Sequence, residues 1–342
     1  MTDTATSTAD AITLQRSIAA PPEVVFEFLV DPEKLLRWMG TEADIEPRPG
    51  GRFWLNINVD NNEGNDAAEG RYLVVDPPNR VSFTWGWVGS EVVPPGSSTV
   101  TFDLEADGAN TIVTLTHSGL PGGQDDQHLE GWMFFLPRLV DIAAYSNARE
   151  LLLEAELELS QQRERVAEIR RSLPLGPLVD NYEFASSDGP VKLTDLFADS
   201  DRPLVLYHFM LGKKQADPCP MCSMWADGWD GVAKHLSQSV DFAVVTAAGV
   251  DRTTEVVNER DWHNLRWLSA ADNTFKTDLG GEDAEGNQWP WISVYQLVDG
   301  EPHLTWSGGA HIKDEHWRGI DLLSPVWHIL DLTPQGRGDW MP

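Results

Sequence analysis

Hydrophobic residues in the first part of the chain alternate with polar ones, as in half-buried strands. Residues 12–18 form the first such segment, and turn residues such as those at 76–79 separate the later ones. The later strand segments are residues 51–57, 69–75, 80–85, 98–104 and 110–117. Residues 20–23 open a helix with proline at its start, residues 31–39 indicate a second short helix, and an amphipathic helix follows at about 127–142. The pattern predicts an α+β domain over residues 12–146.

The remaining residues, 147–342, follow a different order. Residues 147–173 are charged and helical, with an apolar stripe, and a turn lies at 187–190. An apolar strand candidate at 204–210, a helix through Trp225 and a second strand at 240–245 then predict an α/β domain. A further helix (254–260) and a strand with a hairpin turn (289–300) complete it. The first eleven residues, rich in Thr, Ala and Asp, are expected to be a disordered leader.

Both cysteines of the chain, Cys219 and Cys222, lie in the link between the strand at 204–210 and the helix after it. A C-x-x-C that enters a helix within a β-α-β pattern is typical of a thioredoxin-like redox site. The partial positive charge at a helix start favours thiolate, so Cys219 is the candidate nucleophile and Cys222 the candidate resolving thiol. The acidic neighbour Asp217 is expected to oppose thiolate formation.

His208 and Met210 are two residues apart on the preceding strand, so we expect them to share one face beside the cysteines. Together with Trp225 they are expected to shape the site. A core histidine and a packing methionine are the alternative for His208 and Met210, which we favour over metal ligation. An alternative interpretation is a copper or zinc site held by His208, Cys219 and Cys222, because these are soft or borderline ligands. A four-cysteine zinc site is excluded by the cysteine count. We favour redox chemistry over metal binding, and metal binding over inert packing.

Composition narrows the classes of partner. The 342 residues include 54 acidic and 25 basic ones, giving a net charge of −29, which argues against nucleic acid and anionic membrane surfaces as partners. The start of the sequence shows no secretory signal, and no apolar run is long enough to span a bilayer. Two cysteines suit a reducing cytoplasm, so we expect a cytoplasmic protein. Fifteen tryptophans indicate aromatic-lined interiors or pockets.

The N-terminal domain resembles the START-like (SRPBCC) ligand-binding superfamily, and within it the bacterial homologues of the Hsp90 ATPase activator's C-terminal domain. The resemblance is carried by residues 18–26, 31–39, 49–53 and 76–81 and covers about residues 10–146. It implies a helix-grip fold that encloses an apolar cavity for a hydrophobic ligand. The candidate lining residues are Trp54, Trp85, Trp87, Trp132 and Phe135, and for any single one of them we favour simple core packing over a place in the cavity wall.

Residues 147–342 resemble a bacterial thioredoxin-like family of unknown function, DUF899. The matching segments are 170–174, 193–197, 207–212, 219–228, 318–323 and 330–337. The resemblance implies a thioredoxin-like fold but no established reaction. Thioredoxin folds place a cis-proline before the strand that faces the C-x-x-C, and Pro290 is the candidate here, with an ordinary trans proline as the alternative.

These observations predict a thiol–disulfide oxidoreductase that acts through Cys219 and Cys222 and carries an appended hydrophobic-ligand-binding module. One alternative is a copper- or zinc-dependent enzyme. Another is a non-enzymatic ligand-binding or chaperone-linked protein with incidental cysteines. The expected partners are a hydrophobic small molecule or a protein thiol or disulfide. The sequence leaves the substrate, the reductant and the oligomeric state open, a homodimer included.

Overall fold

The computed structural model describes residues 4–7, 11–57, 66–313 and 318–342. The chain divides into two compact units, residues 1–163 and 164–342, and each is described by itself.

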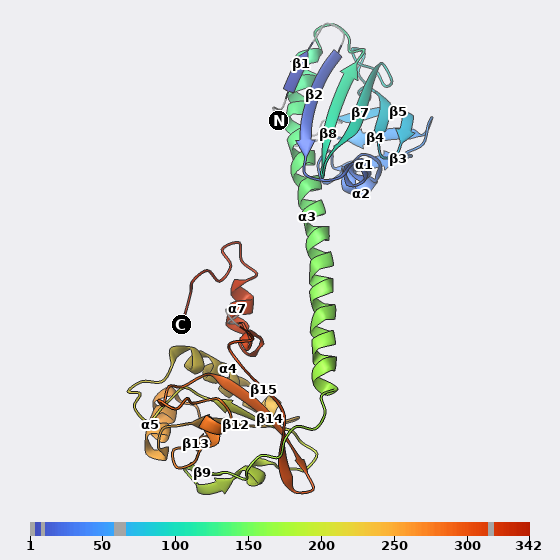
Figure 1. The fold of residues 1–342 in the computed structure, drawn as a ribbon. Coiled ribbons are helices and arrows are strands. Elements are labelled where there is room, and N and C mark those ends of the chain that lie inside the picture. Colours follow the sequence, from blue (N-terminus) through green and yellow to red (C-terminus); the bar gives the residue numbers. More distant parts are fainter. Residues whose placement is uncertain (1–3, 8–10, 58–65, 314–317) are drawn as a thin grey trace. The chain divides into compact units, whose positions relative to one another are not determined.

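The first unit is an eight-stranded antiparallel sheet in the order β1-β2-β8-β7-β6-β5-β4-β3 (Figure 1). Its strands are β1 (Thr4–Ser7), β2 (Ala11–Ile18), β3 (Glu42–Ile45), β4 (Arg52–Asn56), β5 (Ala67–Asp76), β6 (Arg80–Trp85), β7 (Ser98–Asp107) and β8 (Asn110–Ser118). Its helices are α1 (Pro22–Val30), α2 (Pro32–Leu35) and the first part of α3 (Asp125–Arg171). Each α+β element predicted for this unit is present, and β3 is an additional edge strand.

Strand β1 corrects the prediction of a disordered leader over residues 1–11. Thr4–Ser7 pairs antiparallel with β2, from Thr4 opposite Gln15 to Ser7 opposite Ile12. Although the segment is polar and fully exposed, it completes the backbone hydrogen bonds of the β2 edge, which composition alone does not reveal. The rest of the predicted leader, residues 1–3 and 8–10, lies outside the described residues.

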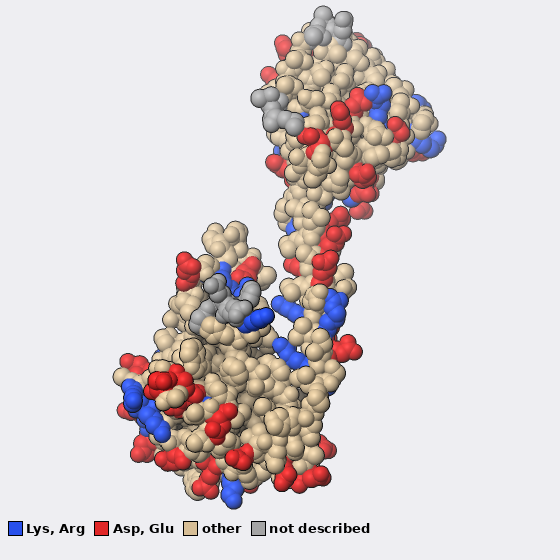
Figure 2. Space-filling model, in the orientation of Figure 1, with Lys and Arg blue, Asp and Glu red and all other residues tan. Residues whose placement is uncertain are grey.

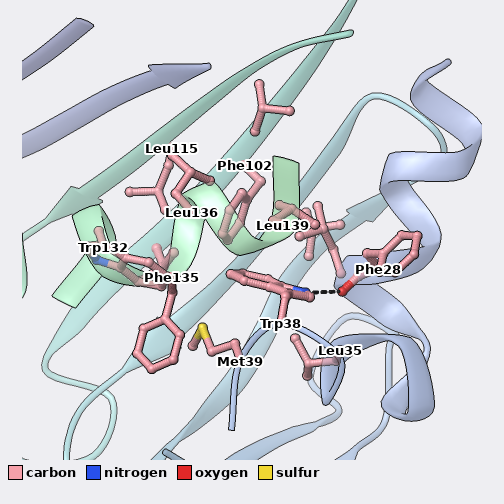
Figure 3. Packing of buried hydrophobic residues seen from close by; sticks show 14 of the residues in the cluster. Phe28, Leu35, Trp38, Met39, Phe102, Leu115, Trp132, Phe135, Leu136 and Leu139 are labelled. Atoms are coloured by element: carbon pink, nitrogen blue, oxygen red, sulfur yellow. Dashed lines mark hydrogen bonds between the residues drawn. The ribbon is translucent and has the colours of Figure 1, made fainter. Parts of the chain in front are cut away.

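The core of the first unit lies between the sheet and its helices. Figure 3 shows side chains of α3 meeting those of strands β7 and β8 and of the segment after α1. Trp38 is buried there, and its Nε1–H donates a 2.9 Å hydrogen bond to the carbonyl of Phe28. Phe53 and Phe83 stack with their ring centroids 4.0 Å apart. Aromatic rings therefore fill much of the space between the layers.

Helix α3 is a single element of 47 residues, where the sequence predicted one helix to 142 and another from 147. The residues in between, Ala143 to Ser146, include neither glycine nor proline, so nothing interrupts the backbone hydrogen bonds. Trp132, Leu136 and Leu139 on its first turns are buried in the core of the first unit. The division between the two units falls within this helix, after Arg163.

The second unit is a seven-stranded mixed sheet in the order β10-β9-β13-β12-β11-β14-β15. Its strands are β9 (Glu183–Ser186), β10 (Gly189–Lys192), β11 (Leu204–His208), β12 (Asp241–Thr246), β13 (Arg266–Ser269), β14 (Trp291–Val298) and β15 (Glu301–Gly309). Its helical elements are η1 (Leu193–Leu196), α4 (Pro220–Leu236), α5 (Val250–Arg260), α6 (Phe275–Asp278), η2 (Asp321–Leu323) and α7 (Pro325–Leu330). Strands β11, β12 and β13 are parallel neighbours, whereas β14 runs antiparallel to β11.

Alternating residues of β11 enter two different cores. Tyr207 packs with residues of α4 and α5, including Trp225 and Val256. Leu206 packs on the other side with residues of η1 and α6. Side chains alternate between the two faces because a strand has a two-residue period. Of the β11 side chains, only those on the face that carries Tyr207 can therefore reach the cysteines.

The surface agrees with the acidic composition. Figure 2 shows acidic side chains over both units, with Lys and Arg side chains scattered among them. Among the described residues, no helix is long and apolar enough to cross a membrane.

Candidate functional site

The loop from β11 to α4 places both cysteines at the start of a helix. Cys219 is the N-cap of α4, and Pro220 follows at the first helical position, where a missing N–H costs nothing. The N–H of Cys219 donates to the carbonyl of Met210 at 3.2 Å, which ties the loop to the end of β11. Both cysteines are free thiols, Cys219 half-buried and Cys222 buried.

The two thiols have opposite electrostatic environments. The hydrogen bond with Cys222 lowers the pKa of Cys219 to about 6, and the backbone N–H groups of Cys222 and Met221 act in the same direction against burial. Burial raises the pKa of Cys222 well above its ordinary value, and the neighbouring Cys219 raises it further. At neutral pH the half-buried thiol therefore carries the negative charge and the buried one keeps its proton.

Asp217 does not have the effect expected from the sequence. The thiolate of Cys219 is favoured although Asp217 is two residues away. Arg252 of α5 approaches this segment, and its guanidinium hydrogen-bonds to the carbonyl of Ala216. The hydrogen bond to Glu255 is the largest cause that raises the pKa of Arg252, and the charge of Asp217 contributes in the same direction. The carboxylate of Asp217 thus interacts with a cation that is distant in sequence, whereas the pKa of Cys219 is set chiefly by the hydrogen bond with Cys222.

Aromatic side chains enclose Cys222. The hydroxyl of Tyr207 donates to Cys222 Sγ at 3.1 Å. Trp225, one turn further along α4, meets the Tyr207 ring edge-on at 5.7 Å and the Trp327 ring at the same distance. The sequence predicted that Trp225 shapes the site, and the structure places it there. Tyr207 was missed, although its position one residue before His208 puts it on the opposite face of the strand.

His208 corrects the predicted grouping of site residues. It lies on the face of β11 opposite Tyr207, where it stacks on Phe275 with ring centroids 4.9 Å apart and its Nε2 pairs with Ser293 Oγ at 3.0 Å. A side chain at Gly281 would collide with its Nδ1, so the ring is closely packed. Among the described residues, no group of three His, Cys, Asp or Glu side chains could hold a metal ion. The copper or zinc site of His208, Cys219 and Cys222 is therefore wrong, because strand alternation separates the histidine from the thiols.

A cavity of about 550 Å³ opens beside Cys219. Its wall is mostly apolar and includes Met210, Met221, Trp225, Trp289, Pro290, Trp327 and Trp340. Met210 and Pro290 thus lie at the site as predicted, but the Trp289–Pro290 bond is trans: within the described residues the one cis bond is Pro77–Pro78. The volume is in the range of small-molecule sites.

The C-terminal segment forms one wall of this cavity and is held by ion pairs. The carboxylate of Asp321 accepts from Arg318 Nε at 2.6 Å and from Arg337 Nη1 at 2.8 Å. Asp331 Oδ2 accepts from the same two arginines, at 3.0 and 2.7 Å. Arg337 also lies over the Trp327 ring. These contacts fix the segment that carries Trp340 against the thiol site.

Lys276 of α6 is a second buried ionisable group near the cysteines that sequence reasoning missed. Its side chain is 1% exposed, and its Nζ donates to the carbonyl of Phe209 and to Gln288 Oε1, both at 2.6 Å. Burial lowers the pKa of Lys276 to about 7, against the opposing effect of Cys222 and Glu282. No local motif marks this lysine, because it reaches the site through tertiary packing.

The first unit contains a smaller apolar cavity, of about 60 Å³. The candidate residues Trp85, Trp87, Trp132 and Phe135 line it, together with His128. Trp54 does not: Phe53 and Leu55 are the buried residues of β4, so Trp54 between them points to the other face.

Two histidines accept hydrogen bonds from tryptophans beside this cavity. Trp132 Nε1–H donates to His117 Nδ1, and Trp87 Nε1–H donates to His128 Nε2, both at 3.1 Å. Burial lowers the pKa of His117 to about 3. A ring nitrogen that accepts a hydrogen bond carries no proton, so both imidazoles are neutral in this arrangement.

Family comparisons assign each unit separately. A family described as "Bacterial protein of unknown function (DUF899)" matches residues 135–341. A family described as "Activator of Hsp90 ATPase homolog 1-like protein" matches residues 19–144, so the N-terminal domain is of this START-like type. No curated protein matches the chain.

Solved structures match about two fifths of the chain. A Chromobacterium violaceum protein is 23% identical with a TM-score of 0.36, over 40% of this chain and 99% of that one. An AHSA1-like protein from Rhizobium etli is 44% identical with a TM-score of 0.31, over 41% and 87%. An HSP90 activator from Plasmodium falciparum is 23% identical with a TM-score of 0.33, over 39% and 95%.

Proposed function

The chain belongs to the bacterial family of unknown function DUF899, and we propose that Cys219 and Cys222 form a thiol–disulfide exchange site in it. The observation that carries the proposal is the division of roles between the two thiols. Cys219 is half-buried at the N-terminus of α4 with a lowered pKa, whereas Cys222 is buried with a raised pKa. An attacking thiolate and a protected resolving thiol need these two environments.

The arrangement of strands supports a thioredoxin-like interpretation of the second unit. The C-x-x-C follows β11, which has the parallel strand β12 on one side and the antiparallel strand β14 on the other, and β14 pairs antiparallel with the edge strand β15. Helix α4 begins directly after Cys219. A trans Pro290 departs from the cis-proline expected of thioredoxin folds, although Pro290 lines the cavity beside Cys219.

The exchange takes place in two steps. The Cys219 thiolate attacks one sulfur of a substrate disulfide, so that a bond forms between Cys219 and this sulfur and the other substrate sulfur leaves with the electron pair. Cys222 then gives its proton to the departing thiolate and attacks Cys219 Sγ, which releases the second substrate sulfur. The chain ends with a Cys219–Cys222 disulfide and the substrate as one thiol and one thiolate, which takes its proton from water, and a dithiol reductant returns the pair to its reduced form.

The cavity beside Cys219 indicates the substrate. Its wall of tryptophan and methionine side chains suits an apolar or aromatic disulfide, or an apolar peptide segment that carries one. The acidic surface disfavours anionic substrates (Figure 2). For the N-terminal domain we propose binding of a small apolar group in its own cavity, which has room for only a few heavy atoms unless Trp132 or Phe135 moves.

The test uses 2,2′-dithiodipyridine, a neutral aromatic disulfide that releases a coloured thione. Reduced wild-type chain should release one equivalent of thione for each of its cysteines and end with an internal disulfide. Cys222→Ser should release half as much and retain a mixed disulfide on Cys219, and Cys219→Ser should react slowly, because Cys222 is buried. Mass spectrometry distinguishes the products. If both wild-type cysteines end as mixed disulfides, or if Cys219→Ser reacts as fast as wild type, the proposal is wrong.

A further inference from the structure

One peptide group lies between Lys276 and Cys222. The carbonyl of Phe209 accepts the hydrogen bond from Lys276 Nζ at 2.6 Å. Burial raises the pKa of Cys222, and the N–H of the same peptide group, which belongs to Met210, opposes this effect as a hydrogen-bond donor toward the sulfur. The C=O and N–H of a trans peptide point in opposite directions. The ammonium group and the sulfur therefore lie on opposite sides of the chain where β11 ends.

The lysine reaches this carbonyl from the other face of the sheet. Phe275, its neighbour on α6, belongs to the core that contains Leu206, whereas Cys222 belongs to the core that contains Tyr207. Lys276 is 1% exposed, and Gln288 Oε1 accepts a second hydrogen bond from Nζ. A charge buried this deeply is costly, so its position beside a single backbone carbonyl calls for an explanation.

We propose that Lys276 is a positioning residue of the thiol site: its ammonium group polarises the Phe209–Met210 peptide and strengthens the hydrogen bond from Met210 N–H to Cys222 Sγ. Hydrogen bonds in a chain polarise one another, and this effect is larger in a low-dielectric interior than in water. The inference rests on the proposed function, because it concerns the step in which Cys222 carries negative charge.

That step is the opening of the Cys219–Cys222 disulfide by a dithiol reductant. A thiolate of the reductant attacks Cys219 Sγ, a bond forms between these two sulfurs, the Cys219–Cys222 bond breaks, and the electron pair remains on Cys222. The new charge meets the hydroxyl of Tyr207 at 3.1 Å and the N–H of Met210. A protonated Lys276 stabilises the negative charge on the leaving Cys222 more than a neutral Lys276 does, so disulfide opening is faster when the lysine is charged.

Lys276 is the group in this neighbourhood that changes charge near neutral pH, because the pKa values of His208 and Tyr207 are shifted away from neutrality. Burial lowers the pKa of His208 well below its ordinary value, with a further contribution from Lys276, so this imidazole stays neutral. Burial raises the pKa of Tyr207 well above its ordinary value, so it keeps its proton. Glu282 favours the charged lysine, and burial lowers the pKa of Lys276 to about 7.

The experiment measures how fast dithiothreitol opens the disulfide of the full chain between pH 5 and 9. The disulfide is prepared with 2,2′-dithiodipyridine, and opening is followed by acid quench, alkylation and mass spectrometry. Each rate constant is divided by the thiolate fraction of dithiothreitol, which removes the reagent's own titration. Lys276→Met removes the charge, and Lys234→Met, at an exposed position on α4, is the matched control.

In the wild type and in the control Lys234→Met, the corrected rate constant should fall about three- to tenfold as the pH rises through 7. A fall of this size is expected when the pKa of the leaving thiol shifts by about one to two units. Lys276→Met should be slower by this factor at pH 6 and show no such fall. A wild-type profile without the fall overturns the inference even if Lys276→Met does not fold, and so does a Lys276→Met profile like that of wild type. If no internal disulfide forms, the proposed function itself fails; a disulfide that opens with a flat profile overturns this inference alone.

Discussion

The thiolate character of Cys219 makes its alkylation unusually fast at neutral and mildly acidic pH. Its pKa is lowered from 9.0 to about 6, chiefly by the hydrogen bond with Cys222. At pH 7 about nine-tenths of Cys219 is then thiolate, against about 1% of an ordinary thiol with a pKa of 9.0. A lower pKa also reduces intrinsic nucleophilicity, with a Brønsted coefficient of about 0.4–0.5. The net advantage at pH 7 is therefore smaller than the ratio of thiolate fractions, whereas the midpoint of the pH profile is unaffected.

The assay is the rate of iodoacetamide alkylation of Cys219 from pH 4 to 10, with the modified residue identified by mass spectrometry. Wild type should show a midpoint near pH 6. Cys222→Ala removes the hydrogen bond that contributes most, so the midpoint should rise by about one pH unit or more. Cys219→Ser is the control, because the buried Cys222 should then react slowly at every pH.

A wild-type midpoint between 8 and 9 would refute the reasoning, since it would mean that burial outweighs the hydrogen bonds to the sulfur. An unchanged midpoint in Cys222→Ala would refute only the assignment of the main cause. The helix N-terminus would then be the dominant source of the lowered pKa.

Two further predictions follow, one for each unit. His117 has a pKa of about 3 in the folded chain and an ordinary value of 6.5, so the unfolded chain binds the extra proton between these values. The free energy of unfolding should therefore fall below pH 6.5, by about 2 kcal/mol at pH 5 relative to pH 7. In urea unfolding, His117→Gln should lack this pH-dependent part of the stability. An equal dependence of stability on pH in both proteins would contradict the prediction. Asp321→Asn weakens two ion pairs of the C-terminal segment, so proteolysis near Arg337 should accelerate while Asp339→Asn, at an exposed position, leaves it unchanged. Equal cleavage of both variants would show that these ion pairs do not hold the segment.

Local patterns were sufficient for most elements of the fold. The alternation at residues 12–18 and 110–117 predicted β2 and β8, which pair along their whole length. The C-x-x-C between an apolar strand and a helix predicted that Cys219 would begin α4. Missed elements were short, such as β3, β13 and α6, because four residues carry too little periodicity to be recognised.

The contents of the site were less predictable, because tertiary packing decides them. His208 was grouped with the cysteines by its distance along the chain, yet the face of β11 on which it lies depends on which residues pack against each side. Trp54 was assigned to the cavity by its residue type, although the burial of Phe53 and Leu55 fixes it on the other face. Lys276 and Arg252 are distant in sequence from Cys219, so no spacing rule connects them with the thiols.

Helix α3 combines two very different environments within one continuous helix. Trp132, Leu136, Leu139 and Ala143 are buried, whereas every side chain from residue 148 to 166 is exposed. Most helical stability comes from packing, so the exposed stretch can open locally at much lower cost than the packed one. Its amide protons should exchange with deuterated solvent well before those of the first turns. The step in protection along α3 would mark, residue by residue, where the core of the first unit ends.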